Sequence, residues 1–180
     1  MTNRTLTAKA LGVIVAAALL GGCTAPSGPT PTPIPTSVTP SVTATPTLSP
    51  AEQQLADAKA RVVLLWETLD GLLIDPNRSI NELDTLASGE ALSSLQVMLT
   101  TVRQRGQVQV GRTAIPSQSA LVKGDAWVVT SCVDRGNAKL TDKGGVPVTP
   151  APEPRLSHQS TVRAVGSSLQ ITDDQVLGSC

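Results

Sequence analysis

The side chain best suited to proton-transfer chemistry is His158, the single histidine of the chain. An imidazole can act as a general base near neutral pH when an acid such as Asp134, Asp173 or Asp174 orients it. No spacing in the sequence fixes any of these acids beside His158. We therefore favour a histidine at the rim of the domain, satisfied by water or a backbone group, and solvated aspartates at a strand end.

Other catalytic patterns are missing from the sequence, which has no Ser-His-Asp order, glycine-rich phosphate loop or run of metal ligands. Two cysteines and one histidine in the body of the chain do not suggest a metal site. We expect no cofactor, no metal and no catalytic residue. There is also no basic stripe with interleaved aromatic residues, so no nucleic-acid partner is expected.

Residues 1–22 have the pattern of a signal peptide, with a basic start at Arg4 and Lys9 and an apolar stretch of about ten residues. Such a stretch is too short to cross a bilayer core of about 30 Å. The following Leu20-Gly21-Gly22-Cys23 resembles the bacterial lipobox. This resemblance implies that Cys23 carries acyl chains such as palmitate and anchors the protein to the extracytoplasmic side of the cell membrane. A signal peptide cut elsewhere, with Cys23 left as a disulfide partner, is the alternative.

If Cys23 is committed to lipid, Cys132 and Cys180 are the remaining thiols. Export places the domain where disulfides persist, and only one intramolecular pairing is then available. We predict a Cys132–Cys180 disulfide. A free, buried Cys132 with Cys180 bridging to another molecule is the alternative.

Residues 23–50 form the next segment, the lipidated cysteine followed by a stalk of mostly Thr, Pro and Ser without a charged residue. This composition cannot bury enough apolar surface to fold, so we expect an extended, disordered linker. Loss of residues 1–22 leaves 12 of the 14 basic side chains against 14 acidic ones, a net charge of −2.

The side chains above must be positioned by a domain spanning residues 51–180. Ser49-Pro50-Ala51-Glu52 is a helix start with a capping box, and the apolar spacing that follows predicts a helix to about Leu73. A short helical turn is expected at 80–86, and a third helix from Ser88 to about Gly106.

The apolar period changes from 3.6 to 2 after Gly106, which predicts strands at 108–115, 126–134, 138–142, 156–165 and 169–176. A proline-rich loop is expected at 144–154. Helices followed by strands favour an α+β domain, with N-terminal helices packed on one face of a curved antiparallel sheet. Trp66 and Trp127 are the only aromatic residues besides His158, and these three side chains are the candidate lining of a pocket inside the domain.

Several segments carry a family resemblance. They are Trp66-Glu-Thr-Leu69, Ala87-Ser-Gly-Glu-Ala-Leu92, Trp127-Val-Val-Thr-Ser-Cys-Val-Asp134 and Ile171-Thr-Asp-Asp174 with the final Gly-Ser-Cys180. They resemble small secreted or lipid-anchored proteins of actinobacteria and their phages, with the cone-shaped fold of the nuclear transport factor 2 superfamily.

These observations together predict a non-enzymatic, membrane-anchored envelope lipoprotein that binds a partner protein or a small apolar ligand. A phage or prophage lipoprotein that gives immunity by excluding related phages is one alternative. The superfamily resemblance implies another, a cyclase- or isomerase-like enzyme that uses His158.

Overall fold

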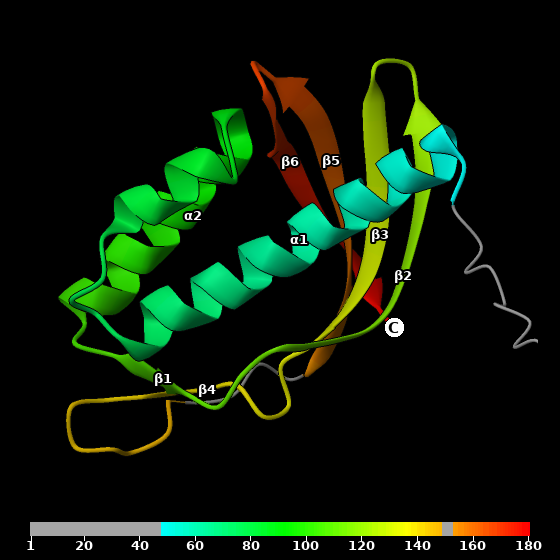
Figure 1. Cartoon of the computed structure of the whole chain (residues 1–180). Coiled ribbons are helices and arrows are strands. Elements are labelled where there is room, and N and C mark those ends of the chain that lie inside the picture. The colour runs from blue at the N-terminus through cyan, green and yellow to red at the C-terminus, as the bar shows by residue number, and fades with distance from the viewer. Residues whose placement is uncertain (1–47, 149–152) are drawn as a thin grey trace, which may run out of the picture. The chain divides into compact units, whose positions relative to one another are not determined.

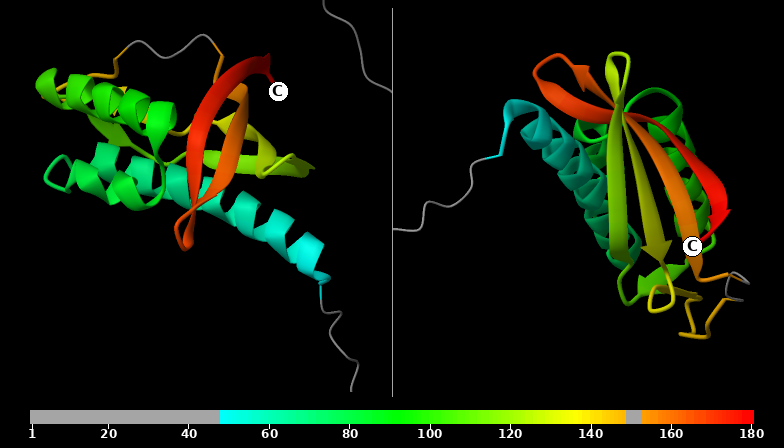
Figure 2. Two further views of the ribbon diagram at one scale, coloured as in Figure 1. Left: turned by 90° about the horizontal axis from the view of Figure 1, so that it is seen from above. Right: turned by 90° about the vertical axis from the view of Figure 1, so that its right-hand side faces the viewer.

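The structure, a computed structural model, describes residues 48–148 and 153–180. The predicted signal peptide, Cys23 and most of the predicted stalk lie outside the described residues. The described residues form an α+β domain in which two helices cover one face of an antiparallel sheet (Figures 1 and 2). The predicted fold class is therefore confirmed.

Helix α1 (Pro50–Ile74) begins and ends where local sequence dictates. The Ser49 hydroxyl accepts from the Glu52 amide, and the Glu52 carboxylate accepts from the Ser49 amide, which completes the predicted capping box. The helix ends at Asp75, directly before Pro76, which disfavours continuation of the helix. Its buried face includes Val62 and Leu69, which lie in the core between the helices and the sheet.

A short helix η1 (Ile80–Thr85) leads to helix α2 (Gly89–Gln104). The segment between them is joined to the sheet, since the Ile171 amide donates to the Leu86 carbonyl and the Ser88 amide to the Ile171 carbonyl, both at 2.9 Å. Gly106 ends the second helix with a φ of 64°, a conformation that glycine adopts without strain. These contacts fix the start of α2 against the edge of the sheet.

The main sheet has the strand order β2-β3-β5-β6, and every neighbouring pair is antiparallel. Its strands are β2 (Ala114–Lys123), β3 (Ala126–Asp134), β5 (Arg155–Val165) and β6 (Ser168–Ser179). Two short strands, β1 (Val108–Val110) and β4 (Lys139–Thr141), pair separately. In Figure 1 this small sheet lies below the main one, at the end where the second helix finishes.

The predicted single strand at 108–115 is wrong. Gly111, with a φ of 82°, interrupts it, and Thr113 turns the chain away from β1 into β2. The second strand then continues to Lys123, through a segment for which we predicted no strand. The period of this edge strand is hidden in the sequence because the part-buried Gln118 is polar while Leu121 and Val122 are exposed.

A buried carboxylate holds this break in place. Asp70, on α1, is 3% exposed. Its Oδ1 accepts from Gln109 Nε2 at 2.7 Å and from Thr113 Oγ1 at 2.8 Å, and its Oδ2 accepts from the Thr113 amide at 2.7 Å. The buried polar group is thereby paired on both oxygens, and the helix is connected to the strands on either side of Gly111.

Candidate functional site

His158 lies on the face of β5 that the helices cover, and the residue is only 8% exposed. Its Nδ1 is 2.8 Å from Asp174 Oδ2 on β6, and the same carboxylate accepts from Ser160 Oγ at 2.6 Å. The edge of the imidazole meets the Trp66 ring, with centroids 5.0 Å apart. A carboxylate and an indole thus hold the histidine ring in one orientation.

A row of polar side chains continues from His158 across the sheet. Ser131 on β3 is its cross-strand partner and is fully buried, and Gln118 on β2 donates to the Ser131 hydroxyl at 3.0 Å. His158 Nε2 has no hydrogen-bond partner within the described ranges and is not sealed from solvent. Chemically, the histidine is an oriented imidazole with one free ring nitrogen.

The rim position that we predicted for His158 is wrong. The side chain is nearly buried, and its partner is a carboxylate rather than water or a backbone group. Of the three candidate acids only Asp174 reaches it, because Asp134 binds Arg155 and Asp173 accepts from Gln175 on the opposite face.

The register between β5 and β6 explains why the sequence did not reveal this pair. From the Gly166 turn the strands pair regularly as far as Val162 and Ile171, and a bulge at Thr172 then shifts the register by one residue. A one-residue shift exchanges the two faces of a strand. The bulge therefore places Asp174, rather than Asp173, beside His158.

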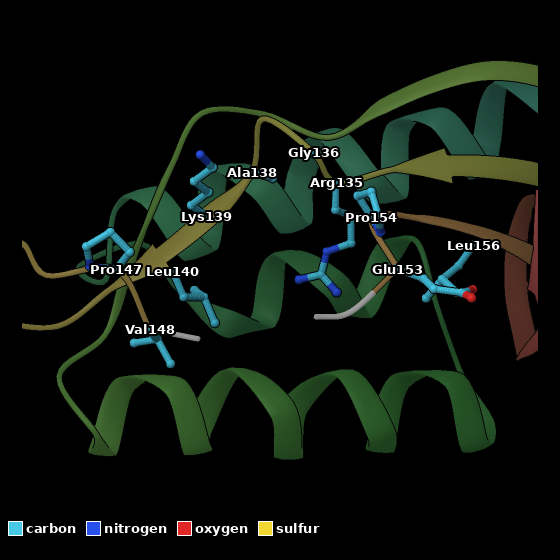
Figure 3. A pocket seen from close by; sticks show the side chains of 10 residues that line it. All are labelled: Arg135, Gly136, Ala138, Lys139, Leu140, Pro147, Val148, Glu153, Pro154 and Leu156. Atoms are coloured by element: carbon cyan, nitrogen blue, oxygen red, sulfur yellow. The ribbon is translucent and has the colours of Figure 1, made fainter. Parts of the chain in front are cut away.

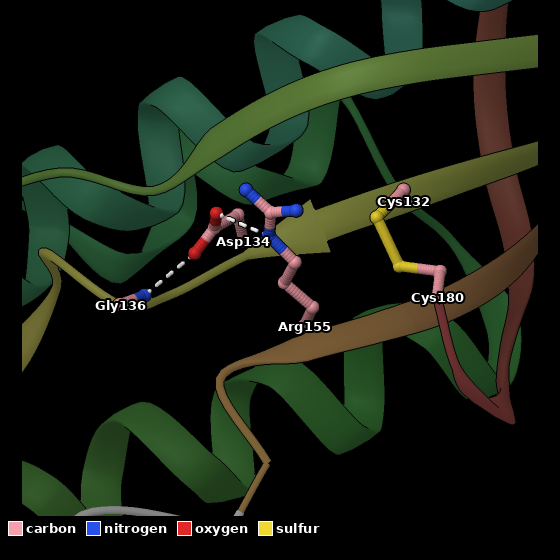
Figure 4. The surroundings of a disulfide bond; sticks show 5 residues. All are labelled: Cys132, Asp134, Gly136, Arg155 and Cys180. Atoms are coloured by element: carbon pink, nitrogen blue, oxygen red, sulfur yellow. Dashed lines mark hydrogen bonds and ion pairs between the residues drawn. A yellow bond between two sulfur atoms is a disulfide. The ribbon is translucent and has the colours of Figure 1, made fainter. Parts of the chain in front are cut away.

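The predicted disulfide is present on the other face of the sheet. Cys132 on β3 and Cys180 have their Cα atoms 5.8 Å apart and are joined through their sulfurs. Strand β5 lies between β3 and β6 in the sheet, so the chain end must cross β5 to reach its partner (Figure 4). The disulfide thus ties the C-terminus to β3 across β5, the strand that lies between β3 and β6.

Next to this bridge an ion pair connects the ends of β3 and β5. The Gly136 amide donates to Asp134 Oδ1 at 2.9 Å, and Arg155 Nε donates to Asp134 Oδ2 at 2.7 Å. These hydrogen bonds, that of the amide foremost, hold the pKa of the Asp134 carboxyl below its ordinary value of 3.8. The turn after β3 is therefore anchored on both sides of Arg135.

A cavity of about 420 Å³ opens beyond this turn, between β4 and the start of β5 (Figure 3). Its wall is mainly apolar and its charged residues are Arg135, Lys139 and Glu153. The apolar lining consists of Ala138, Leu140, Pro147, Val148, Pro154 and Leu156.

The predicted pocket residues Trp66, Trp127 and His158 do not line this cavity. Trp66 and His158 fill the space between α1 and the sheet, and Trp127 packs partly buried against the same core. Part of the true lining, Pro147, Val148, Glu153 and Pro154, falls in the predicted proline-rich loop, where apolar residues carried no periodic signal. The rest lies in the turn after β3 and in the predicted strands at 138–142 and 156–165. The segments come together because the Val148 amide donates to the Leu140 carbonyl at 2.8 Å and the Arg135 amide donates to the Pro154 carbonyl at 2.7 Å.

No group of three or more potential metal ligands occurs among the residues that the structure covers. Within the same residues, no helix has both the length and the apolar character needed to span a membrane.

Comparisons with known proteins assign no family to this chain. No family model matches the chain, and no curated protein matches its sequence. The intermembrane space region of the chloroplast protein ARC6 superposes with a TM-score of 0.49 at 19% identity, covering 74% of this chain and 100% of that chain. Aln2 from a Streptomyces species gives 0.45 at 11% identity, covering 72% and 91%. A de novo designed β-sheet protein gives 0.38 at 12% identity, covering 71% and 92%.

Proposed function

We propose that this protein is an exported, lipid-anchored envelope protein whose domain binds a small apolar ligand. The observation that carries the proposal is the cavity of about 420 Å³ next to the turn after β3. Its volume lies in the range of about 300–1,000 Å³ that is usual for small-molecule sites, which are concave and mostly apolar with a few polar groups.

The position of the cavity also favours a binding site over a packing defect. The core between helices and sheet is made of closely grouped apolar side chains, of which Val62, Leu99, Val129, Val162 and Ile171 are each fully buried. The cavity lies outside this core cluster. A hollow there can be filled or emptied without loss of core packing.

Fluorescence of N-phenyl-1-naphthylamine, an uncharged apolar probe, tests the proposal. Val148→Trp should fill part of the cavity, since Val148 is one of the residues that line it (Figure 3), and should abolish the rise in probe fluorescence that the unaltered chain gives. Val97→Trp is the matched control, because Val97 is 67% exposed on α2. The proposal fails if the unaltered chain gives no rise, or if both variants bind the probe equally well.

The anchor and location rest on the sequence of the N-terminal region, in which Leu20-Gly21-Gly22 precedes Cys23. We expect intact mass measurement of protein extracted from membranes to show acylated Cys23 as the first residue. An unmodified, freely soluble mature chain would contradict this part of the proposal.

Proton transfer by His158 is a second candidate function, favoured by the 2.8 Å contact between its Nδ1 and Asp174. A carboxylate at one ring nitrogen orients the other to act as a base. His158→Gln keeps a polar side chain at this site. A strain that makes this variant at the normal protein level should lose the proton-transfer activity of His158. An unchanged phenotype would exclude an enzyme that depends on His158.

Four further statements remain predictions from the sequence. They are an envelope protein partner, immunity against phages, an origin in actinobacteria or their phages, and the likeness to the nuclear transport factor 2 superfamily. Chemical crosslinking in the native envelope tests the first of these. A specific crosslinked protein would support a partner, and its absence under conditions that crosslink other envelope proteins would count against one.

A further inference from the structure

One guanidinium group, that of the exposed residue Arg135, lines the mainly apolar cavity. Arg135 follows β3, and its backbone is fixed because its amide donates to the Pro154 carbonyl at 2.7 Å and its carbonyl accepts from the Ala138 amide at 3.0 Å. Figure 3 shows the side chain extending from this turn into the space between Leu140 and Leu156. The charge therefore projects into the hollow from an anchored backbone.

This guanidinium has no ion-pair partner within residues 48–148 and 153–180. Its neighbour Arg155, by contrast, is paired with Asp134 at 2.7 Å. The side chain of Lys139 points away from the hollow in Figure 3. Arg135 is thus the cation that is available to a ligand in the cavity.

We infer that the cavity binds a single-chain amphiphile with a monoanionic head, a free fatty acid whose carboxylate meets Arg135. This inference rests on the proposed ligand-binding function and specifies its ligand. The planar guanidinium can donate two parallel hydrogen bonds to a carboxylate, while the apolar wall receives the alkyl chain. Glu153, the one acid in the lining, repels any anionic head, and a head with two negative charges more strongly than a head with one.

The test compares decanoate, 1-decanol and decyl phosphate, which share an alkyl chain and differ in the charge of the head. Binding is measured at pH 8 by displacement of N-phenyl-1-naphthylamine, with an exported chain that carries Cys23→Ser and so has no acyl chain of its own. We expect decanoate to bind about fivefold more tightly than 1-decanol, equivalent to about 1 kcal/mol. The factor is modest because Arg135 is exposed to solvent.

Arg135→Gln should remove the preference for decanoate and leave 1-decanol binding unchanged. Arg105→Gln, which removes an exposed arginine at the end of α2, should leave the preference intact. Equal affinity of the unaltered chain for decanoate and 1-decanol would overturn the inference while the ligand site stands, and so would tighter binding of decyl phosphate. Failure of the uncharged probe to bind at all would overturn the proposed function itself.

Discussion

Replacement of Asp70 by alanine should strongly destabilise the domain. The carboxylate is 3% exposed and accepts three hydrogen bonds, from Gln109 Nε2 and from the amide and hydroxyl of Thr113. In Asp70→Ala the Thr113 groups lose their partner. Gln109 keeps one hydrogen bond, to the Gly111 carbonyl at 3.2 Å, but is itself only 2% exposed.

Hydrogen bonds to a charged group contribute about 1.5–3 kcal/mol each, and a buried donor without a partner costs a further desolvation penalty. Part of this loss of stability is offset, because the variant no longer pays the desolvation cost of burying a carboxylate. We expect a net loss of about 3 kcal/mol in the free energy of unfolding, which corresponds to a fall in Tm of about 10 °C for a domain of this size.

Urea unfolding followed by tryptophan fluorescence measures this loss, since Trp66 is buried in the core and Trp127 packs against it. Asp57→Ala is the matched control, because Asp57 is exposed on the same helix and accepts only from Gln53. The control should change the free energy of unfolding by less than about 0.5 kcal/mol. An equally small change in Asp70→Ala would refute the role of Asp70 as the connection between α1 and the strands.

Three further predictions concern other parts of the domain. Peptide mapping without reductant should join Cys132 to Cys180, and reduction should lower the free energy of unfolding by up to about 4 kcal/mol, the chain-entropy value for a separation of 48 residues; two freely alkylated thiols would exclude the bridge. The lowered pKa of Asp134 means that its carboxylate stabilises the fold above the ordinary pKa of 3.8, and that this contribution is lost as pH falls through the folded value. The free energy of unfolding of Asp134→Asn should therefore fall less steeply than that of the unaltered chain as the pH is lowered below 4. An identical dependence of the free energy of unfolding on pH in the two chains would contradict this. His158→Ala should lower the free energy of unfolding by about 1–2 kcal/mol through loss of its contacts with Trp66 and Asp174, and unchanged urea midpoints would show that those contacts are not stabilising.

The helices and the central strand were predictable because their signals are local. The capping box at Ser49 and the apolar spacing of α1 involve residues within a few turns of each other. Strand β3 has the predicted bounds, since it is a continuous run of mainly apolar and β-branched residues. The break at Gly111 was missed because it depends on Asp70, more than forty residues earlier in the chain, which no local pattern reveals.

The sequence by itself predicted the class of the domain, the Cys132–Cys180 pair and the bounds of β3. Only the tertiary structure decided which aspartate meets His158, because a single bulged residue, Thr172, exchanges the faces of Asp173 and Asp174. Side chains alternate between faces every residue, so a shift of one residue is invisible in composition yet reverses every contact beyond it. The cavity lined by Arg135 is a second example, because hydrogen bonds between separate segments, from Val148 to Leu140 and from Arg135 to Pro154, bring its walls together.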